Sequence, residues 1–278
     1  MRSPSTTTID QKFVALEERA SFRNQVARGL WQGKNAYRKK YPEWEYWHNE
    51  ITVLNSVSDH DELHVPHLYQ VSEVDLVAVI SVMPGEKFAA ITTHQVHRLA
   101  VNLRTFHHAQ LICALVRLDL GERLALFRNN IVEAECLNLA EKRTAEQAIE
   151  LAQAELLPRA HELKQLVHGD FNLGNVLYDP QSDQVGLIDF ERAHTGFGLL
   201  DIAKGAWRIL NNNPEAIEEF LLAYYGRLPT AEERRSFVLA QLYEYLGSVS
   251  YFAFEGYKNG FPYKDEAINH IAQCLIQF

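Results

Sequence analysis

The chain has 278 residues, 47% of them hydrophobic and 23% charged, which is enough for one large domain or two lobes around a buried core. Its 14 glycines and 9 prolines are too few for a collagen-like or low-complexity chain. The formal net charge of −9 argues against a nucleic-acid backbone as the main partner, so an anionic ligand would need local Lys or Arg residues or a metal ion.

Cysteine usage and hydropathy favour a cytoplasmic protein. The three cysteines, Cys113, Cys136 and Cys274, are odd in number and have no CxxC spacing, which argues against a disulfide framework or a thiolate zinc site. Residues 1–10 lack the apolar segment of a signal peptide, and no apolar run approaches the ~20 residues of a membrane span. We therefore expect a cytoplasmic location and no membrane partner.

The N-terminal part of the chain predicts a helix followed by a hairpin. Residues 1–20 predict a polar leader and a short amphipathic helix, with Phe13 and Leu16 among its apolar side chains. Two short extended segments, 25–31 and 35–39, then flank a Gln-Gly-Lys turn, which is the signature of a β-hairpin.

A helix and two more strands follow. Residues 45–57 place apolar side chains on one helical face. Residues 67–71 and 74–82 predict two strands joined by a tight polar turn, and the second is apolar enough to lie in the middle of a sheet. These elements together predict a small β-rich region.

Beyond Pro84-Gly85 the pattern becomes helical, so we place the boundary between two lobes, 1–83 and 84–278, at this break. One island, residues 168–189, returns to short extended pieces with a turn at 179–183. The segments with apolar residues three and four apart are 93–110, 111–127, 131–167 and 199–278.

The candidate functional side chains lie in this island. It contains two carboxylates and an amide, those of Asp170, Asn175 and Asp189, each beside a short hydrophobic strand. Hard oxygen donors of this kind suit Mg²⁺, which uses one or two carboxylates together with substrate phosphates. Phosphoryl transfer needs such a set and one more carboxylate to orient the attacking hydroxyl.

The spacing from Asp170 to Asn175 equals that of the protein-kinase catalytic loop, and Asp189 begins a segment placed like the kinase Asp-Phe-Gly. Glu191 replaces the glycine of that segment, and Gly169 replaces the arginine before the catalytic aspartate. The two motifs, His-Gly-Asp-x-x-x-x-Asn and Ile-Asp-Phe-Glu, resemble those of the aminoglycoside phosphotransferase and choline kinase family. The resemblance implies an α+β, two-lobed protein-kinase-like fold, with a small antiparallel β-sheet lobe and a mainly helical C-terminal lobe.

The family resemblance also implies roles for these residues in a phosphotransferase that uses ATP and Mg²⁺ and an alcohol acceptor. Asp170 would be the catalytic residue that orients the acceptor hydroxyl, and Asn175 and Asp189 would hold the metal. His168 and Asp201 would support the catalytic loop. Glu191 would either touch metal or substrate or cap the next segment.

The N-terminal lobe would bind the nucleotide. Lys39 resembles the strand lysine that pairs with the phosphates, and Glu50 resembles its helix partner. Arg38 and Lys40 are alternatives, but the two-residue period of the strand favours Lys39.

The segment after this lobe resembles the family's hinge. The backbone groups of Ser81 and Met83 would bind the adenine edge, with Ile80 as a wall of the pocket. No G-x-G-x-x-G motif is present, so residues 31–34 are the candidates for phosphate contacts from the nucleotide loop.

The acceptor is less defined by the sequence. We expect a small-molecule alcohol: an amino-alcohol such as choline, an aminoglycoside, or a sugar-like compound, and no nucleic acid. Aromatic residues between 243 and 263 could form a cage for a cationic substrate, or could simply pack the helices. The alternatives to a small-molecule kinase are an inactive nucleotide-binding regulator and a protein kinase, although no Ala-Pro-Glu motif follows Asp189.

Overall fold

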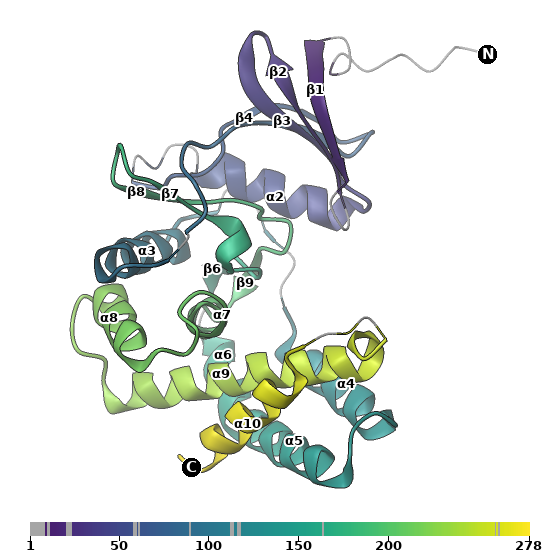
Figure 1. The fold of residues 1–278 in the computed structure, drawn as a ribbon, viewed down its shortest axis with the longest axis vertical. Helices are drawn as coiled ribbons and strands as arrows, with labels where there is room; N and C mark the ends of the chain where they lie inside the picture. The colour runs from purple at the N-terminus through teal and green to yellow at the C-terminus, as the bar shows by residue number, and fades with distance from the viewer. Residues whose placement is uncertain are drawn as a thin grey trace.

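The fold is that of a computed structural model, in which the chain forms a β-sheet at one end and a larger helical part at the other (Figure 1). The residues that it describes are 9, 12–20, 24–57, 60, 62–88, 90–111, 114–115, 118–162, 164–258, 260 and 262–278.

The N-terminal sheet is antiparallel and has five strands in the order β1-β2-β3-β5-β4. One helix, α2 (Trp44–Val57), packs against it (Figure 1). The strands are β1 (Phe13–Ala20), β2 (Gln25–Trp31), β3 (Lys34–Lys40), β4 (Leu68–Ser72) and β5 (Val77–Ser81). The predicted hairpin, helix and two later strands are therefore confirmed, with β5 in the interior of the sheet.

The prediction of a helix within residues 1–20 is wrong, because Phe13–Ala20 forms β1. This strand pairs with β2 from Phe13 opposite Trp31 to Ala20 opposite Gln25. The pairing needs Gly29, since a Cβ at that position would lie 2.2 Å from the Val14 carbonyl oxygen. Phe13 is buried in the sheet core, whereas Val14 and Leu16 are exposed, so the apolar residues do not share one helical face.

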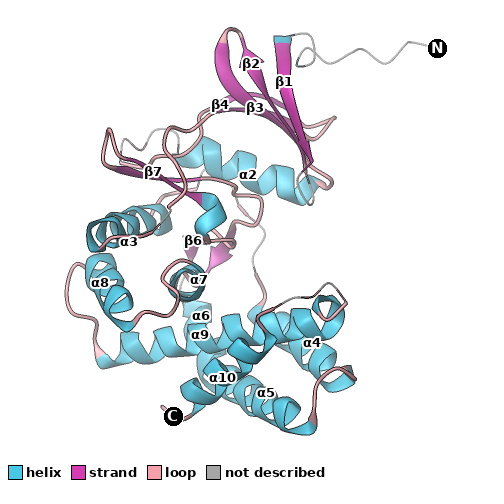
Figure 2. Ribbon diagram, in the orientation of Figure 1, coloured by secondary structure: helices cyan, strands magenta, loops and turns pink. Residues whose placement is uncertain are grey.

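The remaining elements build the helical part (Figure 2). The predicted boundary at residues 83 and 84 falls in the connection between β5 and α3. The helices are α3 (Thr93–His107), α4 (Leu120–Glu133), α5 (Leu139–Leu151), α6 (Leu157–Glu162), α7 (Leu199–Arg208), α8 (Pro214–Tyr225), α9 (Ala231–Tyr251) and α10 (Lys264–Leu275), with π-helical turns at Ala152–Leu156 and Phe252–Gly256.

Two of the predicted helical segments differ in the structure, one at its start and one by an internal break. The described residues between 111 and 119 are not helical, and α4 begins only at Leu120, where the Asp119 side chain accepts a hydrogen bond from the Glu122 N–H. The segment 131–167 is divided by a second cap at Asn138, and its last residues form a strand. Capping side chains thus set boundaries that apolar spacing alone does not reveal.

The predicted island lies between the sheet and the helices (Figure 1). It contains the strands β7 (Val176–Asp179) and β8 (Gln184–Leu187), which pair with each other, and it is flanked by β6 (Gln165–Val167) and β9 (His194–Gly196), which also pair. A 3-10 turn, Leu173–Asn175, precedes β7. Phe171 of the island and Phe190 directly after it are fully buried, so the core fixes the loops here.

The helical part surrounds α9, which contacts α4, α5, α7 and α10. Cys136 and Cys274 are free thiols, and Cys113 lies outside the described residues. Within the described ranges, every helix is too short or too polar to cross a membrane. The expected α+β architecture, a small antiparallel sheet beside a mainly helical region, is confirmed.

Candidate active site

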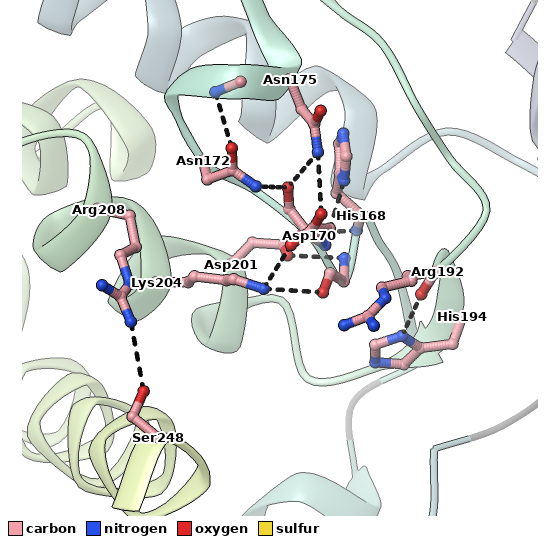
Figure 3. Close-up of polar contacts among 12 residues, drawn as sticks. His168, Asp170, Asn172, Asn175, Arg192, His194, Asp201, Lys204, Arg208 and Ser248 are labelled. Carbon is pink, nitrogen blue, oxygen red and sulfur yellow. Dashed lines mark hydrogen bonds and ion pairs between the residues drawn. The ribbon is translucent and has the colours of Figure 1, made fainter. Parts of the chain in front are cut away.

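The loop that follows β6 is held by Asp201 at the start of α7 (Figure 3). The Asp201 carboxylate accepts hydrogen bonds from the N–H groups of His168 (2.6 Å) and Gly169 (2.9 Å), and His107 Nε2 lies 3.1 Å from it. Burial acts to raise the pKa of Asp201, but His107 and the His168 N–H outweigh it, so the pKa is lowered. A fully buried carboxylate therefore stays ionised and fixes the backbone of the loop.

Replacing Asp201 by asparagine should destabilise the fold by about 3 kcal/mol at pH 7, because buried donors lose a charged acceptor. The folded pKa of Asp201 is below its unfolded value, so its contribution is complete above about pH 4 and is lost as the pH falls through the folded value. The gap between wild type and Asp201→Asn in urea unfolding should therefore shrink below about pH 4. Exposed Asp265→Asn is the control, and an equal loss there would contradict the assignment.

Gly169 is required by the geometry of this loop. Its φ is +74°, and a Cβ would lie 2.2 Å from the Arg192 carbonyl oxygen. The close approach brings the segment after Asp189 against the loop that carries Asp170. Only glycine combines this backbone conformation with this contact.

A matched pair of variants tests that requirement. Gly33 has a similar φ of +81° but nothing within 4 Å of an added Cβ. Gly33→Ala should cost about 1 kcal/mol of backbone strain, whereas Gly169→Ala should cost about 3 kcal/mol because the steric clash is added. Equal melting temperatures for the two variants would contradict this reading.

Asp170 lies at the centre of the site and has two side-chain partners (Figure 3). Asn175 donates its amide N–H to Asp170 Oδ2 (3.1 Å) and to the Asp170 carbonyl (2.8 Å), and Lys204 Nζ lies 2.8 Å from Asp170 Oδ1. Burial acts to raise the pKa of Asp170, but Lys204 and, more weakly, Arg192 lower it below its usual value. The carboxylate is therefore anionic at neutral pH, and its two oxygens contact Asn175 and Lys204.

His168 is buried beneath this loop and does not face solvent. Its Nε2 lies 3.1 Å from the Ile188 carbonyl, and its Nδ1 accepts from the Asp170 N–H (3.3 Å). Burial lowers the pKa of His168. A neutral imidazole therefore links the two segments that carry the motifs.

The β7–β8 hairpin brings Asn175 and Asp189 together. Val176 is opposite Leu187 in the hairpin, and the Ile188 N–H donates to the Asn175 carbonyl (3.1 Å). Asp189 adopts φ +70°, a strained conformation for a residue other than glycine. Because of this backbone contact, Asn175 and Asp189 both lie at the same end of the hairpin.

Lys39 connects this centre to the N-terminal sheet. Its ammonium lies 2.5 Å from Glu50 Oε2 and 2.8 Å from Asp189 Oδ1, and Tyr41 donates its hydroxyl to Glu50 (2.8 Å). Burial acts to lower the pKa of Lys39, but the charges of Glu50 and Asp189 raise it above its ordinary value. Burial raises the pKa of Glu50, and Lys39 opposes that shift.

Of the three candidate cations on β3, the structure brings Lys39 to its predicted partner, Glu50, and also to Asp189. Arg38 lies over the Phe13 ring, with its guanidinium carbon 5.4 Å from the ring centroid, and Lys40 is exposed. The two-residue period of the strand therefore selects the residue that the structure places beside Glu50 and Asp189.

Glu191 is buried and is bound to the N-terminal sheet region. Its carboxylate accepts from the Asn24 side chain, and its carbonyl accepts from Asn49 (3.4 Å). These contacts hold Glu191 to a residue before β2 and to one on α2, and neither of them caps the segment that follows Glu191.

The predicted hinge residues lie at the end of β5. The Ser81 N–H donates to the His67 carbonyl (2.8 Å), so only the Ser81 carbonyl could face a ligand there. Ile80 is buried, and the Met83 methyl group packs on Gly186 of β8. The hinge therefore connects the sheet to the hairpin that carries Asn175 and Asp189.

Lys204, Arg192 and Arg208 were not among the residues that the motifs select. Lys204 lies one helical turn after Asp201, so helical spacing places it on the same face of α7. That spacing is the one signal that could have found it. Arg192 follows the second motif directly, but no short-range pattern indicates that it approaches Asp170.

Comparison with known proteins agrees with this geometry. Among curated proteins, none matches this sequence significantly. Solved structures share the fold. A choline/ethanolamine kinase family protein from Mesorhizobium loti has a TM-score of 0.70 at 15% identity over 98% of this chain and 90% of that chain.

Two further structures are similar over nearly the whole chain. An aminoglycoside phosphotransferase from Alicyclobacillus acidocaldarius has a TM-score of 0.66 at 15% identity, covering 99% of this chain and 93% of its own. A spectinomycin phosphotransferase in complex with ADP and spectinomycin has a TM-score of 0.65 at 14% identity, covering 94% and 92%. The two-lobed kinase-like fold is thereby confirmed. Because the model of the phosphotransferase enzyme family matches residues 13–238, which include both motifs, this chain belongs to the phosphotransferase enzyme family.

Proposed function

We propose that the protein transfers the γ-phosphate of ATP to the hydroxyl group of a small-molecule alcohol, in a reaction that depends on Mg²⁺. The observation that carries this proposal is the convergence of Asp170, Asn175 and Asp189 with the buried Lys39–Glu50 pair. Positioning and charge neutralisation account for most of the catalysis in phosphoryl transfer, and this arrangement supplies both.

Lys39 and the hinge would hold the nucleotide. Lys39 would pair with the phosphates, oriented by Glu50, and its raised pKa keeps it charged. The Ser81 carbonyl and the Met83 N–H would meet the adenine edge, with Ile80 beside the ring. The ADP in the spectinomycin phosphotransferase structure supports a nucleotide in this fold.

Asn175 and Asp189 fit a magnesium ion that arrives with the nucleotide. Asn175 directs its amide nitrogen at Asp170, which leaves its oxygen for another partner, and Asp189 uses only one oxygen on Lys39. Within the described ranges, no group of three His, Cys, Asp or Glu residues could hold a metal unaided. Two oxygen-bearing residues suit a Mg²⁺ ion that also takes phosphate oxygens as ligands. The ion would neutralise negative charge on the triphosphate.

Asp170 would accept a hydrogen bond from the acceptor hydroxyl and direct its oxygen at the γ-phosphorus. The new bond joins that oxygen to phosphorus, the bond between the γ-phosphorus and the β,γ-bridging oxygen breaks, and ADP leaves. The hydroxyl proton passes to Asp170 and then to solvent. The low pKa of Asp170 suits a group that orients the nucleophile in its ionised form.

The acceptor classes suggested by the sequence are an amino-alcohol, an aminoglycoside and a sugar-like compound. The neighbours named as choline/ethanolamine kinase family protein and aminoglycoside phosphotransferase support the first two as classes. A protein kinase is disfavoured by the missing Ala-Pro-Glu motif. An inactive regulator is disfavoured by the complete set of Asp170, Asn175 and Asp189.

The test is a screen for ADP formation from Mg-ATP with a panel of amines, sugars and antibiotics that carry hydroxyl groups, followed by product mass. A product heavier than its acceptor by one phosphoryl group supports the proposal. Nucleotide binding without ADP formation from any alcohol would favour the regulator, and the absence of a thermal shift with Mg-ATP would contradict both.

A further inference from the structure

Lys204 extends from α7 to the loop that carries Asp170 (Figure 3). Its ammonium donates to Asp170 Oδ1 (2.8 Å) and to the Gly169 carbonyl (3.3 Å). The Lys204 side chain is 20% exposed and that of Asp170 is 31% exposed, so water screens this ion pair less than it screens a pair on the open surface. Lys204 therefore holds two adjacent residues of the loop at once.

Asp201 and Lys204 bind this loop from one face of α7. They are three residues apart, a spacing that makes their side chains neighbours on a helix. Asp201 accepts a hydrogen bond from the Gly169 N–H (2.9 Å), whereas Lys204 donates one to the Gly169 carbonyl (3.3 Å). Both backbone polar groups of Gly169 and one oxygen of the Asp170 carboxylate are thus bound to a single helix. Because Ile202 of this helix is buried in the core, α7 is a fixed support for the loop.

The two oxygens of the Asp170 carboxylate have different partners. Lys204 lies on Oδ1, and the Asn175 amide donates to Oδ2 (3.1 Å). A carboxylate oxygen has two lone pairs, so each oxygen keeps one for a further donor. One partner on each oxygen restricts the rotation of the carboxylate, and this fixes the direction in which a free lone pair can meet the hydroxyl of an acceptor.

Other charged groups nearby do not replace either member of this pair. Within the described ranges, Asp170 is the one carboxylate at ion-pair distance from Lys204. Glu244 on α9 interacts with Lys204 through its charge, but burial raises the pKa of Glu244 to about 7, so this carboxyl is partly neutral at neutral pH. Arg192 acts on Asp170 through its charge, and more weakly than Lys204 does. Lys204 is therefore the cation that contacts the Asp170 carboxylate directly.

We propose that Lys204 is a positioning residue: together with Asn175, it holds the Asp170 carboxylate so that a free lone pair faces the acceptor hydroxyl. This role rests on the proposed function and deepens it. A cation beside a carboxylate makes that carboxylate a weaker base. The weakening matters little in phosphoryl transfer, which depends more on positioning and charge neutralisation than on proton removal.

The test replaces Lys204 by methionine, which keeps the apolar part of the side chain and removes the charge. Choline, kanamycin and glucose serve as the acceptors, and kinetics are measured with the one that gives the fastest ADP formation and a phosphorylated product. Lys204→Met should lower kcat at least about tenfold, since a misplaced catalytic group can slow a reaction by about 10²-fold. The KM for Mg-ATP should change by less than about twofold, because Lys39, Asn175 and Asp189 are intact. Lys204→Arg keeps a positive charge at this position and should recover part of the loss.

Lys264→Met is the matched control. Lys264 is 19% exposed and, like Lys204, pairs with a carboxylate of another element, that of Glu141 in the first turn of α5. Its replacement should lower the melting temperature by an amount comparable with that for Lys204→Met and should leave kcat unchanged. Equal kcat values in wild type and Lys204→Met, or equal losses of kcat in the two methionine variants, would overturn the positioning role. A loss of Mg-ATP binding in Lys204→Met would overturn it as well.

A double variant shows whether Lys204 acts through Asp170. In the Asp170→Asn background, Lys204→Met should change the residual kcat by less than about twofold, since residues that act as a unit have non-additive effects. A further tenfold loss in that background would mean that Lys204 acts on the transferred phosphoryl group itself, and the positioning role would be wrong. The absence of ADP formation by the wild type with every alcohol tested contradicts the proposed function, whereas an active wild type with an unaffected Lys204→Met variant contradicts only the role of Lys204.

Discussion

Replacing Asp170 by asparagine should lower kcat for phosphoryl transfer by about 10²–10⁴-fold, the range found when a positioned general base is removed. The asparagine keeps the size of the side chain and can still contact Asn175, so the loop should fold normally. It lacks the charge that orients a hydroxyl and that pairs with Lys204 at 2.8 Å. The stabilisation of the protein by Mg-ATP in a thermal shift assay should change little, because Lys39, Asn175 and Asp189 are intact.

Asp179→Asn is the matched control for this result. Asp179 accepts hydrogen bonds from the Gln181 N–H (3.0 Å) and the Ser182 hydroxyl (2.6 Å) in the β7–β8 turn, so its carboxylate is engaged at the opposite end of the hairpin from Asn175 and Asp189. This variant should retain its turnover. Undiminished kcat in Asp170→Asn would exclude Asp170 from the role proposed for it, and a parallel loss of Mg-ATP binding would point to a collapsed loop instead.

The sequence predicted the fold where local chemistry dominates. The hairpin around Gln32-Gly33 and the helix with Glu50 depend on turn residues and apolar spacing, which act within a few positions. It failed for β1, because Phe13–Ala20 is a strand only through pairing with β2 and through the close approach at Gly29. No pattern within the segment itself records that partner.

The residues of the candidate site also differ in whether a local sequence pattern reveals them. Asp170, Asn175 and Asp189 could be found because fixed spacing along a loop and a hairpin is a property of the sequence itself. Lys204 has only the weak signal of its spacing from Asp201, since its contact with Asp170 arises when α7 packs beside the loop that follows β6. Short motifs thus select the proposed site residues of the loop and the hairpin, whereas a contact made from a helix depends on packing that is set by the whole core.

Replacing Asp189 by asparagine should remove the magnesium dependence of nucleotide binding. In wild type, Asp189 places one oxygen on Lys39 and leaves the other for a metal that bridges to the phosphates. Asparagine also tolerates the left-handed backbone at φ +70°, so the loop geometry should persist. The Kd for ATP measured by calorimetry in the presence of Mg²⁺ should rise at least about tenfold, which corresponds to 1.4 kcal/mol. The value of kcat/KM should fall by more than this factor, because the charge on the transferring phosphoryl group is no longer neutralised.

Asp183→Asn is the control, because it makes the same substitution at another aspartate with a left-handed backbone, φ +54°. Asp183 lies in the β7–β8 turn, where its carboxylate contacts His94 and Tyr178. It should keep the Mg²⁺ effect on ATP binding. In EDTA, wild type and Asp189→Asn should bind ATP with similar affinity, because Lys39 retains Glu50 in both. If Mg²⁺ strengthens ATP binding equally in wild type and Asp189→Asn, the metal is held by other groups, and the oxygen set of Asn175 and Asp189 loses its proposed function.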